Sequence, residues 1–112
     1  MEKAPNKKIY DLEERTAVFG EAVIRLCKGI RQDAITKPLV NQLVRSSTSV
    51  GANYMEANGA SSKKDFINKI FICKKESQET KHWLRMLSSC LSEKKDDIRI
   101  LWQECQELTL IF

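Results

Sequence analysis

The chain has 112 residues, of which 42% are hydrophobic, and its 19 basic and 15 acidic residues give a net charge of +4. This length predicts one domain, and two prolines and four glycines provide too few turn signals for a sheet-rich fold. No apolar run approaches the roughly 20 residues of a membrane-spanning helix, and the N-terminal residues lack the apolar core of a secretory signal. We therefore expect a cytoplasmic protein without a membrane partner.

The first eight residues are polar, and we expect them to be disordered. The remaining residues, 9–112, contain no linker, internal repeat or low-complexity tract. They are predicted to form a single helical domain.

Apolar and small side chains recur at alternating steps of three and four residues in four successive segments. These stripes are Leu12, Thr16, Phe19, Val23, Leu26 and Ile30; Val40, Leu43, Ser47, Val50 and Tyr54; Phe66, Ile70, Cys73, Ser77, Thr80, Leu84, Leu87 and Leu91; and Ile98, Leu101, Cys105, Leu108 and Phe112. Such a repeat keeps one face of a helix against neighbours that cross it at about 20°. Because the connections are short, neighbouring helices must be antiparallel. The sequence predicts an all-α, antiparallel up-down-up-down four-helix bundle.

Several residues mark the expected helix boundaries. Pro38 suits the first turn of the second helix, where its missing N–H is not needed. Gly59 tolerates a left-handed cap at the end of that helix. Ser62 and Asp65 resemble a capping box at the start of the third helix, and Asp96 suits the first turn of the fourth.

Small residues and a second apolar line distinguish the third helix. Ser77 and Thr80 lie in the middle of its stripe, where we favour close helix packing over a ligand site. Trp83, Met86 and Cys90 form a line offset from that stripe. This line predicts a contact with another helix of the bundle or with a neighbouring subunit, and we slightly favour the subunit.

No constellation of residues indicates catalysis. The four cysteines lack metal-binding spacing and lie on apolar lines, where reduced thiols act as small hydrophobes. His82 has Arg85 and Met86 at the third and fourth positions after it, so no acid on its helix orients the ring. Phosphate-binding, dinucleotide-binding and zinc-protease motifs are absent from the sequence. We expect no catalytic residue, metal site, cofactor or small-molecule substrate.

Basic side chains gather on one flank of the third helix, opposite the flank of Asp65, Glu76 and Glu79. This basic strip comprises Lys63, Lys64, Lys74, Lys75, Lys81 and Arg85. Its length, roughly 33 Å at 1.5 Å per residue, suits a nucleic-acid backbone, and a solvated helix face is the open alternative. We expect no exposed aromatic side chain among these cations, so binding to phosphates would be weakly sequence-selective.

A polar line on the second helix consists of Arg45, Ser49, Asn53 and Glu56. It is either a solvated face or a seam between subunits. In the second case, Arg45 and Glu56 would pair with groups such as Glu76 or Glu79 of a neighbouring copy. Both interpretations stay open.

The stretch 42–57, QLVRSSTSVGANYMEA, resembles the central signature of the bacterial four-helix bundle protein family, also called the 23S rRNA intervening-sequence protein family. The similarity extends over about residues 10–110 and includes SSKKDF at 61–66, KKE at 74–76, Glu79, and Trp83 with Leu84. It implies a cytoplasmic bundle that assembles into a closed homo-oligomeric ring, typically a pentamer. The family name refers to reading frames within insertions in ribosomal RNA genes.

A related branch, the accessory variability proteins of diversity-generating retroelements, is similar in fold and supports a reverse transcriptase and its RNA template. Two hypotheses follow from the residues and the resemblance. The chain is a non-enzymatic ring that binds RNA or another nucleic acid through the basic strip. Alternatively, it is a protein-interaction scaffold, such as a reverse-transcriptase accessory-like subunit, that binds no nucleic acid.

Overall fold

The computed structural model describes residues 11–112. The expected disorder of residues 1–8, and the first two positions of the predicted bundle, lie outside the described residues. Four α-helices and one short 3-10 helix make up the regular structure, and the described part of the chain contains no strand. They are α2 (Leu12–Lys28), α3 (Thr36–Asn58), α4 (Lys63–Cys90), η1 (Ser92–Lys94) and α5 (Lys95–Ile111). The predicted all-α four-helix fold is confirmed.

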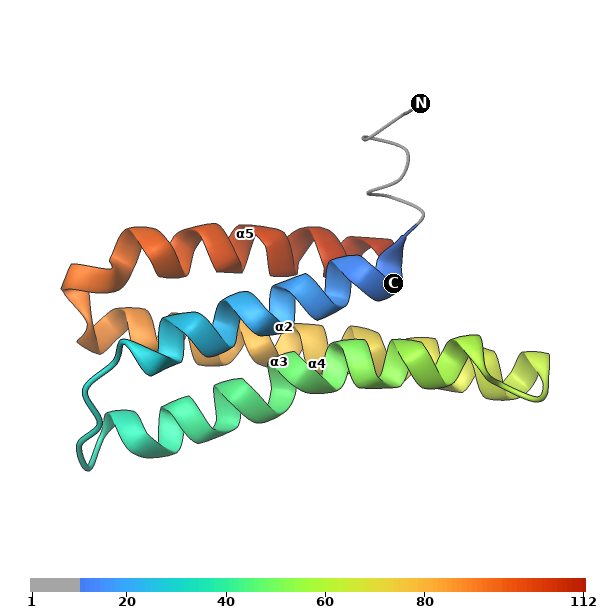
Figure 1. Ribbon diagram of the computed structural model, residues 1–112, viewed down its shortest axis with the longest axis horizontal. Coiled ribbons are helices and arrows are strands. Elements are labelled where there is room, and N and C mark those ends of the chain that lie inside the picture. Colours follow the sequence, from blue (N-terminus) through green and yellow to red (C-terminus); the bar gives the residue numbers. More distant parts are fainter. Residues whose placement is uncertain (1–10) are drawn as a thin grey trace.

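Successive helices run in opposite directions and are joined by short connections at alternating ends (Figure 1). Each helix packs against two others: α2 contacts α3 and α5, and α4 also contacts α3 and α5. The longest pairing is between α3 and α4. Their hairpin projects beyond α2 and α5 at one end of the molecule (Figure 1).

The helix boundaries follow local hydrogen bonding. The Ser62 hydroxyl accepts a 3.0 Å hydrogen bond from the N–H of Asp65, which confirms the predicted cap of α4. Pro38 lies in the first turn of α3 as predicted. The left-handed cap expected at Gly59 was wrong, because Gly59 has a φ of −97° and its N–H continues to bond carbonyls of the last helical turn.

Before α3, a local cap was missed by the sequence interpretation. One carboxylate oxygen of Asp33 accepts hydrogen bonds of 2.8 Å from the N–H groups of Ile35 and Thr36. The Thr36 hydroxyl accepts a 2.9 Å hydrogen bond from the N–H of Asp33. These bonds hold the pKa of the Asp33 carboxyl below its usual value, chiefly through the N–H of Thr36.

The predicted stripes supply the core. Fully or nearly fully buried members are Phe19, Val23, Val40, Leu43, Val50, Cys73, Leu84, Leu87, Ile98, Cys105 and Leu108. Stripe residues near the helix ends, such as Leu12 and Tyr54, are half-buried, and Phe66 is the one stripe residue that is exposed, at 41% of its surface. It lies in the first turn of α4, where the projecting hairpin has only two helices and cannot enclose a side chain on every side (Figure 1).

Small polar residues fill the contact between α3 and α4. Ser46, Ser77 and Thr80 are completely buried. The hydroxyl oxygens of Thr80 and Ser46 lie 2.8 Å apart, and the Ser77 hydroxyl donates to the Cys73 carbonyl at 2.8 Å. Because these hydroxyls find partners, the helices approach closely without leaving buried polar groups unpaired.

Candidate nucleic-acid interface

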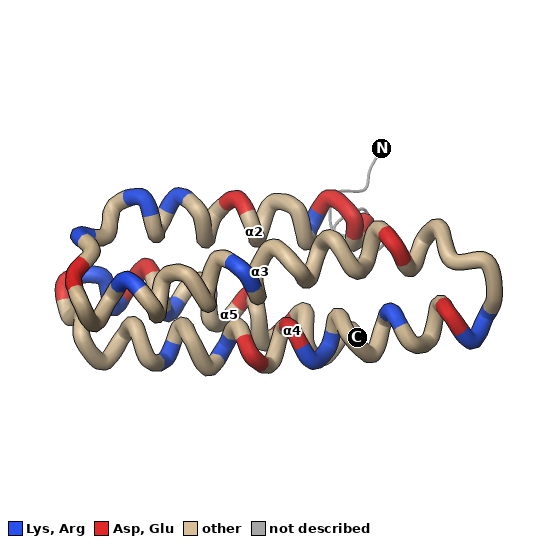
Figure 2. Tube along the Cα trace, turned by 90° about the horizontal axis from the view of Figure 1, so that it is seen from below, with Lys and Arg blue, Asp and Glu red and all other residues tan. Residues whose placement is uncertain are grey.

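Both signs of charge occur along α4, and they follow one another along its length (Figure 2). Their positions around the helix decide which neighbouring helix each group meets. One flank of α4 faces α3, and another faces α5. The chemistry of the two flanks differs.

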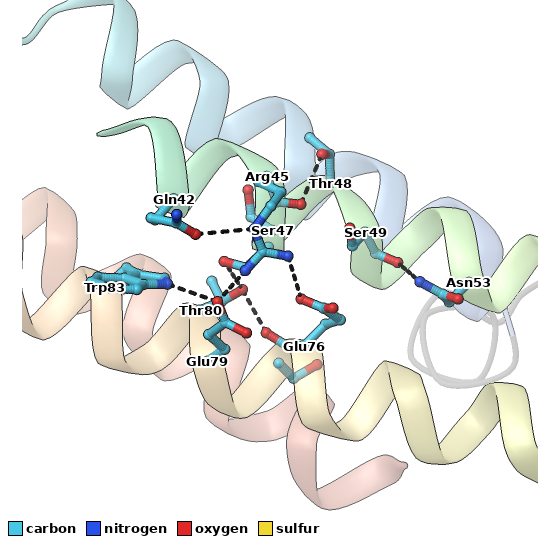
Figure 3. A network of polar contacts seen from close by, with 12 residues as sticks. Gln42, Arg45, Ser47, Thr48, Ser49, Asn53, Glu76, Glu79, Thr80 and Trp83 are labelled. Carbon is cyan, nitrogen blue, oxygen red and sulfur yellow. Dashed lines mark hydrogen bonds and ion pairs between the residues drawn. The ribbon is translucent and has the colours of Figure 1, made fainter. Parts of the chain in front are cut away.

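The acidic flank of α4 is neutralised by α3. Arg45 donates to Glu76 at 3.3 Å and also pairs with Glu79, while its Nε donates to the Gln42 side chain at 3.0 Å (Figure 3). The indole N–H of Trp83 donates to the same Glu79 carboxylate at 3.1 Å. These bonds hold the pKa of Glu79 below its usual value, and the hydrogen bond from Trp83 has the largest effect. We call this network the Arg45 seam.

The rest of the polar line on α3 also finds its partners within one chain. The Asn53 amide donates to the Ser49 carbonyl at 2.8 Å, one helical turn away (Figure 3). Lys69 donates to Glu56 at 2.7 Å. Arg45 and Glu56 thus each have ion-pair partners within one chain. A place for this line in a contact between copies stays a prediction.

The three residues of the second apolar line of α4 differ in their burial. Trp83 packs partly buried against the core of its own chain, whereas Met86 is half-buried and Cys90 is exposed. For Trp83, the structure therefore gives a contact within the chain where we had slightly favoured a neighbouring subunit.

The basic strip is mostly uncompensated. Lys63, Lys64, Lys74, Lys75 and Arg85 are all exposed. None of these five forms an ion pair with any residue from 11 to 112. The remaining member, Lys81, is half-buried, and its ammonium donates to the Gln106 side chain of α5 at 2.6 Å. Five of the six predicted residues thus present their charge to solvent.

The expectation that no exposed aromatic side chain lies among these cations was wrong, because Phe71 of α4 is 61% exposed and lines one hollow with Lys74 and Lys75. A second aromatic side chain, from α5, lies beside the strip. The Lys81 ammonium sits 5.4 Å from the centroid of the Trp102 ring, a distance that suits a cation–π contact. Trp102 is only partly buried. The sequence interpretation considered α4 alone, and Trp102 comes from α5, so no periodicity within one helix could have found it.

A partly buried ion pair between α2 and α5 was also missed by the sequence interpretation. Arg15 of α2 donates from Nε to Glu104 at 2.8 Å and from Nη2 to Glu107 at 2.7 Å. The Arg15 side chain is 8% exposed. Its pKa is raised, mainly by the hydrogen bond with Glu104. This pair directs two acids of α5 toward α2 and away from the basic strip.

Three of the four cysteines are buried thiols. Burial raises the pKa of Cys27 and Cys73 to about 11 and that of Cys105 to about 12, so these thiols stay protonated at neutral pH. His82 is exposed and its ring lies 4.9 Å from that of Trp83. Within residues 11–112, no three His, Cys, Asp or Glu side chains are grouped so as to hold a metal ion.

Among the helices of the described range, none has both the length and the apolar character that a bilayer crossing requires.

Comparisons with known proteins identify the family to which this bundle belongs. A search of curated proteins found no match to the chain. A solved structure from Bacteroides thetaiotaomicron, described as a protein of unknown function from the S23 ribosomal protein family, is similar with a TM-score of 0.78 and 29% identity. The similarity covers 88% of this chain and 93% of that one. The family model for 23S rRNA-intervening sequence proteins matches residues 9–111. The chain therefore belongs to the 23S rRNA-intervening sequence protein family.

Proposed function

We propose that the chain is a non-enzymatic bundle that forms a homo-oligomeric ring and binds RNA through the basic strip of α4. The single observation that carries RNA binding is the set of five exposed cations without an ion-pair partner in residues 11–112. Cations that no carboxylate neutralises are free to neutralise phosphates, which releases the counterions condensed on the nucleic acid.

The position of the acids supports this proposal. Glu76 and Glu79 are the acids closest in sequence to Lys74, Lys75 and Lys81, and both are engaged by Arg45. They therefore weaken the positive potential along the outer flank less than free carboxylates would. The strip spans roughly 33 Å, which is long enough to follow several phosphates of one strand.

Exposed apolar side chains support self-assembly. Met55, Phe66, Ile67 and Phe71 on the projecting hairpin are 60%, 41%, 54% and 61% exposed. Several large apolar residues on one projecting end mark an interaction surface, and another copy of the chain is the occupant that the family resemblance implies. In a ring of five, each copy would present one basic strip, so a single RNA could engage several strips with increased avidity.

The same apolar surface favours a second candidate function, a protein-interaction scaffold. In that case the hairpin end of the assembled ring contacts another protein, and the lysines serve only as a solvated face. Such a complex would survive nuclease treatment of the lysate. An RNA-mediated complex would dissociate.

The test of RNA binding is a salt titration with structured RNA. Wild-type protein should bind at low ionic strength, with an affinity that falls steeply as salt rises. A variant with Lys74→Glu, Lys75→Glu and Arg85→Glu should lose about 100-fold or more in affinity and show a shallower salt dependence. Lys81 is left intact, because a carboxylate there would face Trp102 and Gln106 and disturb the helix contact.

A charge-matched control separates the strip from net charge. Lys28→Glu, Arg31→Glu and Lys37→Glu change the net charge by the same amount, two per substitution and from +4 to −2 in total. These three residues are exposed at the connection between α2 and α3 and do not belong to the basic strip. Their replacement should cost far less affinity. Equal losses in both variants, or wild-type protein that does not bind RNA at low salt, would overturn the proposal. Light scattering of the purified protein tests the ring, and a monomer would contradict it.

A further inference from the structure

A groove of about 640 Å³ runs between the second half of α4 and the first half of α5. Its apolar floor is formed by Leu84, Ile98 and Trp102. Leu84 and Ile98 are nearly fully buried core residues, so the floor is fixed by the packing of the bundle. The indole of Trp102 is the one aromatic side chain that lines this groove.

Cations surround this floor. Arg85 of α4 and Lys95 and Arg99 of α5 all line the groove and are exposed. The acid facing this rim is Asp96, which lies 3.7 Å from Arg99, and both side chains are largely in solvent. An exposed pair at this distance contributes little, so the rim has a positive excess.

The two sides of Trp102 are occupied differently. Lys81 lies over the ring and bonds Gln106, one turn further along α5. The groove-lining residues Ile98 and Arg99 lie one turn before Trp102. Trp102 is only partly buried and lines the groove although Lys81 contacts its ring, so part of the indole is accessible from the groove.

We propose that this groove receives an unpaired base of single-stranded RNA, which stacks on Trp102 while its flanking phosphates contact Arg85, Lys95 and Arg99. The inference rests on the proposed function and assigns it a preference for unpaired nucleotides. A flat aromatic surface within a basic groove is the usual arrangement for single-stranded nucleic acid. The Ser88 hydroxyl, which also lines the groove and has no hydrogen-bond partner in the described chain, is available to a base edge.

The experiment uses Trp102 as its own reporter. Trp83→Phe leaves Trp102 as the only tryptophan, because the chain has two. This variant is titrated with a single-stranded RNA of about ten nucleotides, and with an abasic strand of the same length and phosphate number. The base-bearing strand should quench Trp102 fluorescence and bind roughly 10-fold more tightly than the abasic strand.

Trp102→Leu provides the matched affinity measurement. This substitution should abolish the discrimination between base-bearing and abasic strands and leave the salt dependence unchanged, since the phosphate contacts remain. If Trp102→Leu fails to fold, the fluorescence titration of the Trp83→Phe protein still tests whether a base stacks on Trp102.

The outcomes separate this inference from the function on which it rests. Equal affinity for both strands without quenching overturns the inference and leaves RNA binding through phosphates intact. Failure to bind either strand overturns both. A Trp102 response to poly-glutamate of matched charge, with none to RNA, also overturns the inference and identifies the groove as a site for an acidic protein segment.

Discussion

The flank of α4 that faces α3 and the flank that faces α5 differ in the charge that their neighbours supply. On the first flank, Arg45 of α3 neutralises Glu76 and Glu79. On the second, α5 adds Lys95 and Arg99 beside Arg85.

Asp96 of α5 lies 3.7 Å from Arg99, but both side chains are largely in solvent and the pair offsets little of this excess. Glu104 and Glu107 point to Arg15 on the other side of α5. Charge patterning within one helix therefore cannot distinguish a flank whose charges are paired from a flank that keeps a positive excess. The distinction lies in what the adjacent helix presents.

The largest effect should come from the core residue between the two flanks. Leu84 is fully buried and belongs to the core cluster, so Leu84→Ala should lower the free energy of unfolding by about 3 kcal/mol. Ile100, which is 64% exposed, is the matched control, and Ile100→Ala should cost less than about 0.5 kcal/mol. Urea denaturation measures both. Similar small losses would mean that the flanks are not joined by a common core.

A smaller effect should distinguish Arg45 of α3, which pairs with the acidic flank of α4, from Arg85 on the basic flank. Arg45→Met should lower the free energy of unfolding by about 1 kcal/mol or less, because Arg45 is 45% exposed and its ion pairs are screened by water. Arg85→Met should change stability by only a few tenths of a kcal/mol, since Arg85 has no ion pair in the described range.

The order of the two variants should reverse when RNA affinity is measured instead of stability. Arg85→Met should weaken binding, and Arg45→Met should leave it nearly unchanged. Denaturation and RNA titration on the same preparations check this pattern. A loss of RNA affinity in Arg45→Met that equals the loss in Arg85→Met would contradict the division of the flanks.

The smallest effect concerns pH. The pKa of Glu79 in the folded protein lies below its ordinary value of 4.5, so its interactions stabilise the fold above that pH and are lost as pH falls through the folded pKa. The stability difference between wild-type protein and Arg45→Met should therefore shrink as the pH falls from neutral to below 4.5. Denaturation at several pH values measures it. A difference that grows on acidification would exclude Glu79 as the partner of Arg45.

Periodicity was sufficient to predict the fold. The stripes that contain Phe19, Leu43, Leu84 and Leu108 became the core, because only side-by-side helices bury a heptad-spaced face. Capping residues predicted the start of α4 for a similar reason, since Ser62 acts over three residues.

The candidate site was harder to predict because its contacts join different helices. Arg45 can pair with Glu76 of its own chain or of a neighbour with the same sequence pattern, so spacing could not choose between them. The approach of Trp102 to Lys81 and of Arg15 to Glu104 depends on how α5 is rotated against its neighbours. That rotation is set by packing of the whole bundle.

The most direct test of the divided charge on α4 is lysine acetylation followed by mass spectrometry, with and without RNA. In free protein, Lys63, Lys64, Lys74 and Lys75 should react rapidly, whereas Lys81, half-buried on Trp102, and Lys69, paired with Glu56, should react slowly. RNA should protect the four rapid lysines and leave Lys28 and Lys37 unprotected. Uniform protection of all surface lysines, or protection confined to Lys28 and Lys37, would contradict RNA binding by the outer flank of α4.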